Sequence, residues 1–504
     1  DGTEPLTIGE GSTSYVFSYA SGLTRLAFPE RTVKLANYVA SYCTGLKEVT
    51  LPSTLKTLGK DLFYKDTALT TVNFPAEAAF TEITEDMFGY CSALESIRIP
   101  GYIQTIGYKA FESCHGLKNV TFEDSENKLT FGNLAFSLCK GMETFTIPRR
   151  AVKFGDSTFS SCTALKTVNS EPGCQLASVG KMTFGSCSAL ESFVFPSNLA
   201  TIGATMFSGC TNLKSVTFSK SLSTAFNANI FTNCKSLQEI KVEDGSKKYA
   251  VVGGVLFSAD KKTIYYVPAF MNVSTYAVPA GVTTIANSAF GHAQSLTAVT
   301  LPGTLLSIEN SAFSGCKELR SIIIPKSVSS IGTSIFSSCT ALESVTFESG
   351  SKLKKLNNNA FTRDTALKNV TLPESLTEIG TYVFQMTAIE SITVPAGVTS
   401  IGSNAFAGCS ELKVVNFPSG AKLSSLGSGA FQNCTALTAL QLPDSVTSIG
   451  TTAFQNTGFV EFTVPDGVAT IGVNTFQKSL ALKKVTLPDS VTSIGNYAFD
   501  GCTA

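Results

Sequence analysis

The residues of this sequence best suited to chemistry are its 14 cysteines. All but one of them, Cys174, occupy one place in a recurring phrase, three residues after a phenylalanine or the alanine that replaces it. Two consecutive copies of the phrase read SAFSGCKEL and SIFSSCTAL. Thiols can bind a metal, act as nucleophiles or form disulfides. The spacing of the phrase decides among these uses.

That spacing favours packing over chemistry. A metal site needs ligands that converge on one point, whereas these cysteines are about one repeat apart and form a line. A catalytic thiol needs a partner histidine, and the two histidines, His115 and His292, fall in variable turns of different repeats. Ala293, Asp364 and Ser479 stand in the same slot, as expected where a small side chain is packed. We therefore expect free thiols, a non-enzymatic protein, and no catalytic residue, metal site or cofactor.

The phrase belongs to a repeat of about 23 residues, a period typical of leucine-rich repeats. Leu319, Ile322 and Ile324 have the L-x-x-L-x-L spacing of a short strand with one buried face. The proline that follows ends the strand, because it has no N–H to donate. Val328 and Ile331 predict a short extended piece on the return side, and the cysteine phrase is spaced for about one helical or 3₁₀ turn. Such a unit must stack on its neighbours to bury its apolar face.

The repeats fill nearly the whole chain and are interrupted once. Residues 241–280 lack the phrase and contain Gly253 and Gly254 between β-rich runs, a hairpin signal. We predict an N-terminal arm of about ten units over residues 1–240, a β-hairpin-containing insert over 241–280, and a C-terminal arm of about ten units over 281–504, ending in mid-repeat. The predicted fold class is an α/β-type repeat solenoid dominated by short β-strands. It is a right-handed leucine-rich-repeat arc with one parallel sheet on the concave face and short extended or 3₁₀/helical turns on the convex face.

Composition excludes several functions. Basic and acidic residues number 38 each, so the net charge gives no sign of a nucleic-acid-binding surface. No run approaches about 18 consecutive apolar residues, so we expect no membrane span. Tryptophan is absent, which removes the usual platform for sugar stacking, although the chain has 14 tyrosines.

Charges alternate along the stack at the residue after the first leucine of each strand. Examples are Glu143, Lys166 and Glu191, and, further along, Arg320 and Glu343. In stacked strands these residues become lateral neighbours, where opposite charges stabilise by at most about 1 kcal/mol per exposed pair. The pattern indicates a device that fixes register, and ligand recognition through residues such as Arg320 remains the alternative.

The outward strand position two residues before the proline is mostly threonine, which suits a solvated sheet face. Departures from this row are the better candidates for a ligand face, and Ile323 would be an exposed apolar residue that a partner could cover. The departures are Arg98, Val194, Lys241, Ile323 and Gln441. Tyr265 and Tyr266 of the insert form a second candidate patch, because tyrosine is favoured at protein interfaces.

The phrase LPDSVTSIGTTAFQNT (442–457), its copies, and the insert GGVLFSADKKTIYYVP resemble the BspA-like leucine-rich repeat proteins, also called the Treponema-type class. The resemblance covers nearly the whole chain. It implies a secreted or surface-attached protein of anaerobic gut or mucosal microbes or some protozoa, whose known relatives bind host proteins such as fibronectin and fibrinogen, or other bacteria. The family has no shared catalytic residues and no motif for ligand contacts, so none is transferred.

We therefore expect a monomeric extracellular or cell-surface protein, with its signal and any anchor outside this sequence. Its predicted function is adhesion to a protein or glycan ligand, such as a host extracellular or mucosal protein, through the concave sheet, the insert or both. The alternative is a structural protein whose copies associate into a surface coat without a specific host ligand.

Overall fold

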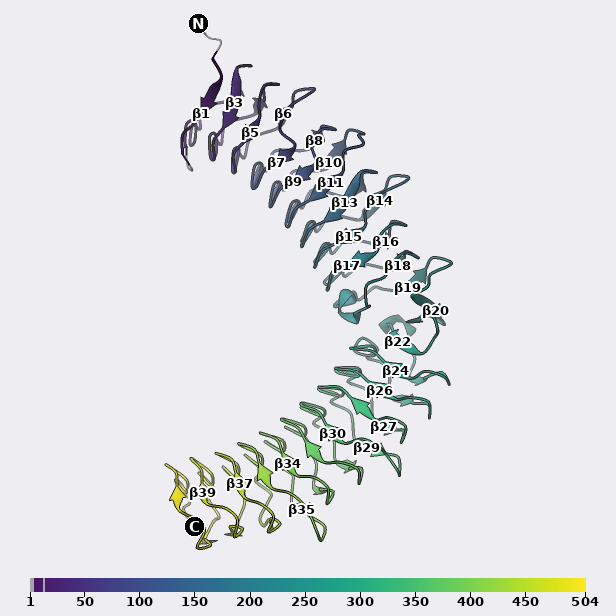
Figure 1. The fold of residues 1–504 in the computed structure, drawn as a ribbon, viewed down its shortest axis with the longest axis vertical. Helices are drawn as coiled ribbons and strands as arrows, with labels where there is room; N and C mark the ends of the chain where they lie inside the picture. Colours follow the sequence, from purple (N-terminus) through teal and green to yellow (C-terminus); the bar gives the residue numbers. More distant parts are fainter. Residues whose placement is uncertain (1–3, 12–13) are drawn as a thin grey trace. The chain divides into compact units, whose positions relative to one another are not determined.

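The computed structural model describes residues 4–11 and 14–504. The chain divides into two compact units, residues 1–251 and 252–504. Each unit is a stack of repeats in which short strands lie side by side (Figure 1). A membrane-crossing helix is not found anywhere in the described ranges.

Nearly every repeat contributes a strand to a main row, which forms from the L-x-x-L-x-L segment and consists of several short parallel sheets. In the first unit the main row contains β2 (Arg25–Ala27), β4 (Glu48–Thr50), β6 (Thr71–Asn73), β8 (Ser96–Ile99), β10 (Asn119–Phe122), β12 (Thr144–Ile147), β14 (Thr167–Ser170), β16 (Ser192–Val194), β18 (Ser215–Phe218) and β19 (Glu239–Val242). In the second unit it contains β23 (Thr275–Ala277), β25 (Ala298–Thr300), β27 (Ser321–Ile324), β29 (Ser344–Phe347), β31 (Asn369–Thr371), β33 (Ser391–Thr393), β35 (Val414–Asn416), β38 (Glu461–Thr463) and β40 (Lys484–Thr486).

A second strand in each repeat forms a parallel return row. In the first unit it contains β1 (Leu6–Ile8), β3 (Thr32–Leu35), β5 (Thr57–Leu58), β7 (Glu82–Ile83), β9 (Thr105–Ile106), β11 (Leu129–Phe131), β13 (Ala151–Phe154), β15 (Ser178–Val179) and β17 (Thr201–Ile202). The boundary between the units falls within β20 (Tyr249–Val252). In the second unit it contains β22 (Thr263–Tyr266), β24 (Thr284–Ile285), β26 (Ser307–Ile308), β28 (Ser330–Ile331), β30 (Lys355–Leu356), β32 (Glu378–Ile379), β34 (Ser400–Ile401), β36 (Ser425–Leu426), β37 (Ser448–Ile449), β39 (Thr470–Ile471) and β41 (Ser493–Ile494).

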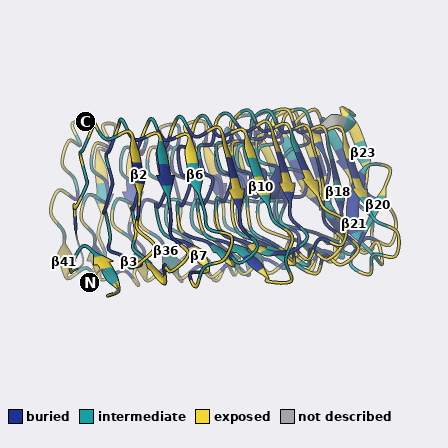
Figure 2. Cartoon of the chain, turned by 90° about the horizontal axis from the view of Figure 1, so that it is seen from above, coloured by how far each residue is buried: buried dark blue, intermediate teal, exposed yellow. Residues whose placement is uncertain are grey.

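The register places equivalent residues of successive repeats beside one another. In the main row Ile322 of β27 lies opposite Val345 of β29, and Ile323 lies opposite Thr346. Residues of β27 alternate between exposed and buried, because successive side chains of a strand point to opposite faces. Figure 2 shows exposed and buried residues within the same short strands. The repeat therefore presents every second side chain of the main row to solvent.

The cysteine phrase forms a third ladder, which we call the turn ladder. Around Phe336, residues Ser334 and Ser338 have φ angles of 56° and 65°, in the left-handed region. The amide of Phe313 donates to the carbonyl of Ile335 at 2.9 Å, so the turns of successive repeats are joined by backbone hydrogen bonds. Three ladders, rather than one sheet, hold each repeat to the next.

The core lies between the ladders. The turn-ladder phenylalanines are buried and stack face to face, with ring centroids 5.3 Å apart for Phe313 and Phe336 and 5.7 Å apart for Phe336 and Phe361. The leucine and isoleucine side chains of both rows complete this core. Stacking distances between about 4.5 and 7 Å are the favourable range for aromatic pairs.

The structure corrects the predicted fold class in two respects. The predicted single parallel sheet is replaced by two parallel rows, because Ser330–Ile331 and its equivalents pair with one another as strands. The expected helical turns are β-turns in nearly every repeat, and the described part of the chain contains no α-helix. Its two 3₁₀ helices are η1 (Ala228–Phe231), in a cysteine phrase, and η2 (Ala269–Met271). The fold is therefore a β-solenoid of leucine-rich repeats.

The predicted insert contains an antiparallel hairpin. Strand β21 (Val255–Ser258) pairs with β22, which in turn pairs in parallel with β24. The hairpin thus leads the chain into the return row of the second unit. The boundary between the two compact units falls within the predicted insert, between residues 251 and 252.

Candidate functional site

The ladder cysteines are hydrogen-bond donors inside the stack. The Sγ atom of Cys339 lies 3.1 Å from the carbonyl oxygen of Phe313 in the preceding repeat. All other ladder cysteines contact the equivalent carbonyl, at 2.9 to 3.3 Å. Ser479, which replaces cysteine in one repeat, reaches the carbonyl of Phe454 with its hydroxyl at 3.1 Å. The slot therefore favours a small side chain with a donor, although Ala293 stands there without one.

Burial makes these thiols poor nucleophiles. It raises the pKa of Cys114 and of Cys316 to about 12, so neither side chain is a thiolate at neutral pH. All 14 cysteines are free thiols in the structure. Within the described residues, no group of three or more His, Cys, Asp or Glu side chains could hold a metal ion. His115 is exposed, whereas His292 is half-buried against the ring of Tyr266.

Two aspartates occupy the cysteine slot. The Oδ1 atom of Asp66 accepts a hydrogen bond from the amide of Cys43 at 2.7 Å, and Asp364 accepts one from the amide of Cys339 at 2.8 Å. The Oδ2 atom of each is buried without a hydrogen-bond partner. Burial raises the pKa of Asp66 to about 8 and that of Asp364 well above its usual value. Both are structural acids inside the core, where burial favours the protonated form.

The alternating charges are lateral ion pairs of the main row. Lys166 lies 2.9 Å from Glu143, and Lys214 lies 3.0 Å from Glu191. Arg320 lies 4.0 Å from Glu343, at the limit of an ion pair. These contacts agree with a role in strand register. Arg320 belongs to the same alternating series of charges.

The departures from the threonine row are exposed, but they do not form one site. Val194 and Ile323 are 59% and 57% exposed. Arg98 forms an ion pair with Glu123 at 3.0 Å. Lys241 and Gln441 are also exposed, and each lines a hollow of the surface, as Ile323 does. Arg98, Val194 and Lys241 belong to the first unit, and the others to the second.

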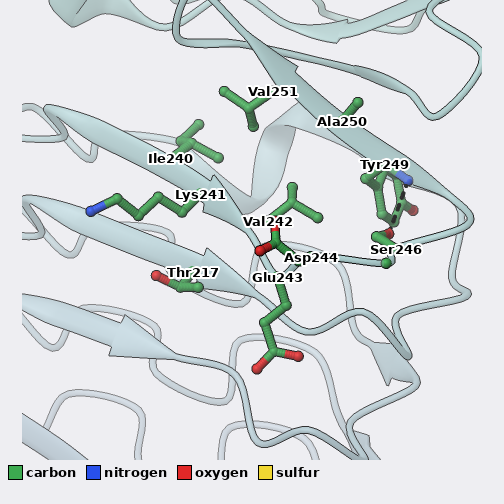
Figure 3. Close-up of a pocket in the computed structure, with 11 residues that line it drawn as sticks. Thr217, Ile240, Lys241, Val242, Glu243, Asp244, Ser246, Tyr249, Ala250 and Val251 are labelled. Atoms are coloured by element: carbon green, nitrogen blue, oxygen red, sulfur yellow. Dashed lines mark hydrogen bonds between the residues drawn. The ribbon is translucent and has the colours of Figure 1, made fainter.

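The hollow at Lys241 lies at the end of the first unit and measures about 560 Å³ (Figure 3). Lys241 is on β19, the last strand of its sheet, which pairs with β18, and its amino group lies 2.8 Å from Glu239. The opposite wall contains Tyr249, whose amide donates to Ser246 Oγ at 3.2 Å and whose hydroxyl donates to the carbonyl of Thr224. This hollow is polar, with an ordered tyrosine on one side and a lysine on the other.

The hollow at Ile323 measures about 310 Å³ and lies on the main row of the second unit. Its lining includes Ala298, Thr300 and Ile323, with Pro325 and Glu348 at the strand ends. An exposed isoleucine beside a small alanine makes this an apolar depression in an otherwise threonine-rich face.

Gln441 lies where the main row is interrupted. Residues 439–441 hold the strand position of their repeat, yet they are not a strand, and the row breaks into β33–β35 and β38–β40. One hollow of about 730 Å³ contacts β35, residues 438–442 and β38, and another of about 510 Å³ lies between residues 415–421 and 441–445. Both include Val415 and Gln441 in their lining. Together they form a groove along the interrupted strand, which we call the strand-gap groove.

The tyrosine patch proposed for the insert is only partly available. Tyr266 is buried, with 2% exposure, which removes it from the candidate ligand face. Tyr265 is half-buried. Consecutive residues of β22 point to opposite faces, so at most one of the pair can face solvent.

An aromatic cluster in the first repeats was not singled out from the sequence. The amino group of Lys65 lies between 5.2 and 5.5 Å from the ring centroids of Tyr42, Tyr64 and Tyr90. Tyr19 stacks on Tyr42 at 4.8 Å. The sequence does carry one sign of this cluster, which is the uneven distribution of tyrosine: more than half of the 14 tyrosines precede residue 109. Lys65 of the same chain contacts these rings, so the cluster is a packing contact between neighbouring repeats.

Comparison with solved structures shows the same fold. A leucine-rich repeat protein from Eubacterium ventriosum is 22% identical, with a TM-score of 0.51, over 72% of this chain and 83% of the other. A leucine rich cell surface protein from Faecalibacterium prausnitzii is 23% identical, with a TM-score of 0.39, over 78% and 87%. The pneumococcal vaccine antigen PcpA is 18% identical, with a TM-score of 0.40, over 78% and 89%.

The sequence itself identifies the family. No curated protein matches the chain. The BspA type Leucine rich repeat region matches in 6 copies, over residues 12–140, 129–251, 268–389 and 377–504. These ranges cover nearly all of the sequence, including both compact units. The chain belongs to the BspA type leucine-rich repeat family.

Proposed function

We propose that this protein is a non-enzymatic, secreted or cell-surface binding protein that attaches to a host extracellular or mucosal protein through the outward face of its main row. Proteins of this family are generally surface proteins that take part in protein interaction. The host ligand and the adhesive role go beyond the family and rest on the surface of this chain.

The observation that carries the proposal is the coincidence of sequence departures and hollows. Lys241, Ile323 and Gln441 each replace threonine in the outward row, and each lines a depression of the surface. A surface coat in which the protein contacts only other copies of itself needs no such variation from one repeat to another. Exposed apolar residues such as Ile323, beside polar walls, are typical of surfaces that a partner covers.

The test is surface plasmon resonance with the chain immobilised and purified fibronectin, fibrinogen or a mucin injected, together with a sizing run. Binding by a monomer that persists at high salt supports the proposal, because contacts between exposed charges are screened there. Ile323→Thr restores the consensus of the row and should weaken binding, whereas Thr346→Ser, on the next strand, should not.

Self-association without binding of any host protein would overturn the proposal in favour of a coat. Equal binding by the wild type and by Ile323→Thr would show that the ligand contacts a part of the surface outside that hollow. It would then direct the search to Lys241 and to the strand-gap groove.

A further inference from the structure

Three tyrosines of the first unit surround the ammonium group of Lys65. Its nitrogen lies over the rings of Tyr42, Tyr64 and Tyr90, at 5.2, 5.3 and 5.5 Å from their centroids. The ring of Tyr64 is inclined at 69° to that of Tyr42 and at 73° to that of Tyr90. The three rings therefore face one point from different directions, and we call them the tyrosine cage.

The turn ladder holds the rings of the cage at a fixed spacing. The amide of Tyr42 donates to the carbonyl of Tyr64 at 2.7 Å, and the amide of Lys65 donates to the carbonyl of Gly89 at 2.8 Å. A Cβ at Gly89 would lie 3.0 Å from the ring of Tyr64, so glycine leaves room for that ring. Because the rings come from three successive repeats, the stacking of the repeats forms the cage without any ligand.

The residue types at this position are unusual for the turn ladder. Tyr42, Lys65 and Tyr90 have φ angles between 60° and 63°, in the left-handed region that large side chains seldom adopt. In later repeats of the first unit the same position is held by smaller residues, among them Ser113 and Ser161. Since serine serves the fold there, the fold does not require the large side chains of the cage.

Lys65 has aromatic neighbours where lysines of adjacent repeats have carboxylates. Lys60 forms an ion pair with Glu85. Lys109 lies 3.1 Å from Glu112. A primary ammonium is strongly hydrated and loses part of its water against rings, whereas a quaternary ammonium has no N–H group to solvate and is the cation that aromatic cages recognise. A quaternary ammonium therefore suits this cage better than the lysine does.

We propose that the tyrosine cage is a binding site for a trimethylammonium group, which takes the place of the Lys65 ammonium. Lys65 is half-buried and has a flexible four-carbon stem, so its side chain can move into solvent without a change of fold. Attraction between the cation and the three rings supplies the affinity. The site lies on the turn ladder and not on the main row, so it does not depend on the proposed function.

The test is ligand-observed NMR titration of the full chain with tetramethylammonium, choline and 3,3-dimethylbutanol, which has the shape of choline but no charge. Lys65→Ser introduces the residue that Ser113 has at the same position, and it removes the competing ammonium. We expect this variant to bind tetramethylammonium at least about tenfold more tightly than the wild type, which itself binds measurably. Choline should bind at least about tenfold more tightly than its neutral analogue.

A second comparison identifies the source of the trimethylammonium group. Choline headgroups and trimethylated lysine side chains both carry it, so the N-acetyl amide of trimethyl-lysine is titrated beside choline. Tighter binding of choline assigns the site to a headgroup, and tighter binding of the amide assigns it to a methylated protein. Either order supports the site itself.

Matched variants show whether the rings bind the probe. Tyr90→Leu in the Lys65→Ser background removes one ring and should lose the gain in affinity, and leucine is compatible with this position because Leu138 holds it in a later repeat. The control is Tyr382→Leu in the same background. Tyr382 is also a half-buried tyrosine of the turn ladder, with a φ of 59°, but it belongs to the second unit. Its replacement should leave the affinity unchanged.

Four results would overturn the inference. The first is that Lys65→Ser fails to bind tetramethylammonium even at hundred-millimolar concentration. The second is binding by Lys65→Ser but none by the wild type, which would make the lysine a permanent part of the packing. The third is equal affinity for choline and its neutral analogue, which would show an apolar contact and not a cation site. The fourth is unchanged affinity after Tyr90→Leu, which would place the bound probe outside the cage.

Discussion

The Sγ atom of Cys114 lies 3.0 Å from the carbonyl oxygen of Phe88 in the preceding repeat. The same carbonyl accepts the amide of Cys91 within its own turn, at 3.2 Å. Each such oxygen is buried, and a carbonyl has two lone pairs to satisfy. The cysteine thus joins two layers of the stack, which explains why the slot recurs and why serine can occupy it.

Removing this donor should destabilise the first unit. We expect Cys114→Ala to lower the free energy of unfolding by about 2 kcal/mol, from the lost hydrogen bond and the cavity. Cys114→Ser keeps a donor of similar reach and should lose about half as much. Urea unfolding monitored by circular dichroism measures both. Equal losses for the two variants would mean that volume, and not the donor, determines the residue in this slot.

The thiols should all be free yet unreactive. In 6 M guanidinium without reductant, we expect titration with Ellman's reagent at pH 8 to detect all 14 cysteines. In the native chain the reaction should be slow, because burial raises the pKa of residues such as Cys114 to about 12. Cys502 is half-buried and should react first. A total well below the sequence count in the unfolded, unreduced chain would reveal disulfides.

Hydrophobic periodicity predicted the strands but not the turns. The spacing of Leu319, Ile322 and Ile324 located β27, because period-two burial leaves a direct trace in sequence. The turn ladder leaves no comparable trace, since its left-handed positions include Ser334 and Ser338 rather than glycine. Inter-repeat hydrogen bonds compensate there for a conformation that isolated serines seldom adopt.

The candidate site was predictable in part for a related reason. A break in the threonine row is visible in sequence, and it pointed to Gln441. The loss of strand pairing is not visible, because Leu437, Leu440 and Leu442 keep the L-x-x-L-x-L spacing. Ala298 stands at the position equivalent to Ala439 and is paired in β25, so the residue at this position does not by itself distinguish the two repeats.

Arg150 offers a test of cohesion between repeats. It is buried, and its guanidinium donates to the carbonyls of Ile103 at 2.5 Å and Pro100 at 3.1 Å. Arg150→Met leaves these acceptors without their donor, so we expect a loss of about 3 kcal/mol in the free energy of unfolding.

The matched control for this substitution is the adjacent arginine. Arg149 is more exposed and forms ion pairs with Asp124 and Glu126, so Arg149→Met should cost less than about 1 kcal/mol. Urea unfolding of the two variants under identical conditions gives the comparison. Similar losses at both positions would show that the buried arginine contributes no more than a surface ion pair.

Asp66 should make the first unit less stable in alkaline solution. Its pKa is about 8 in the folded chain, raised by burial from a reference value of 3.8. A raised pKa means that the folded state holds the proton more tightly than the unfolded state does. The resulting stabilisation is fully present below about pH 4 and is lost as the pH rises through about 8. We expect a loss on the order of 3 kcal/mol between pH 5 and pH 8.5.

Asp66→Asn isolates this contribution. Asparagine keeps the acceptor for the amide of Cys43 and cannot ionise, so its stability should vary less with pH. The variant should exceed the wild type by much more at pH 8.5 than at pH 5. Glu77→Gln, at an exposed position of the same unit, serves as the control and should not reproduce this gain. Unfolding curves at both pH values provide the measurement. If the difference between Asp66→Asn and the wild type does not change with pH, the carboxyl has an ordinary pKa and is charged in the core.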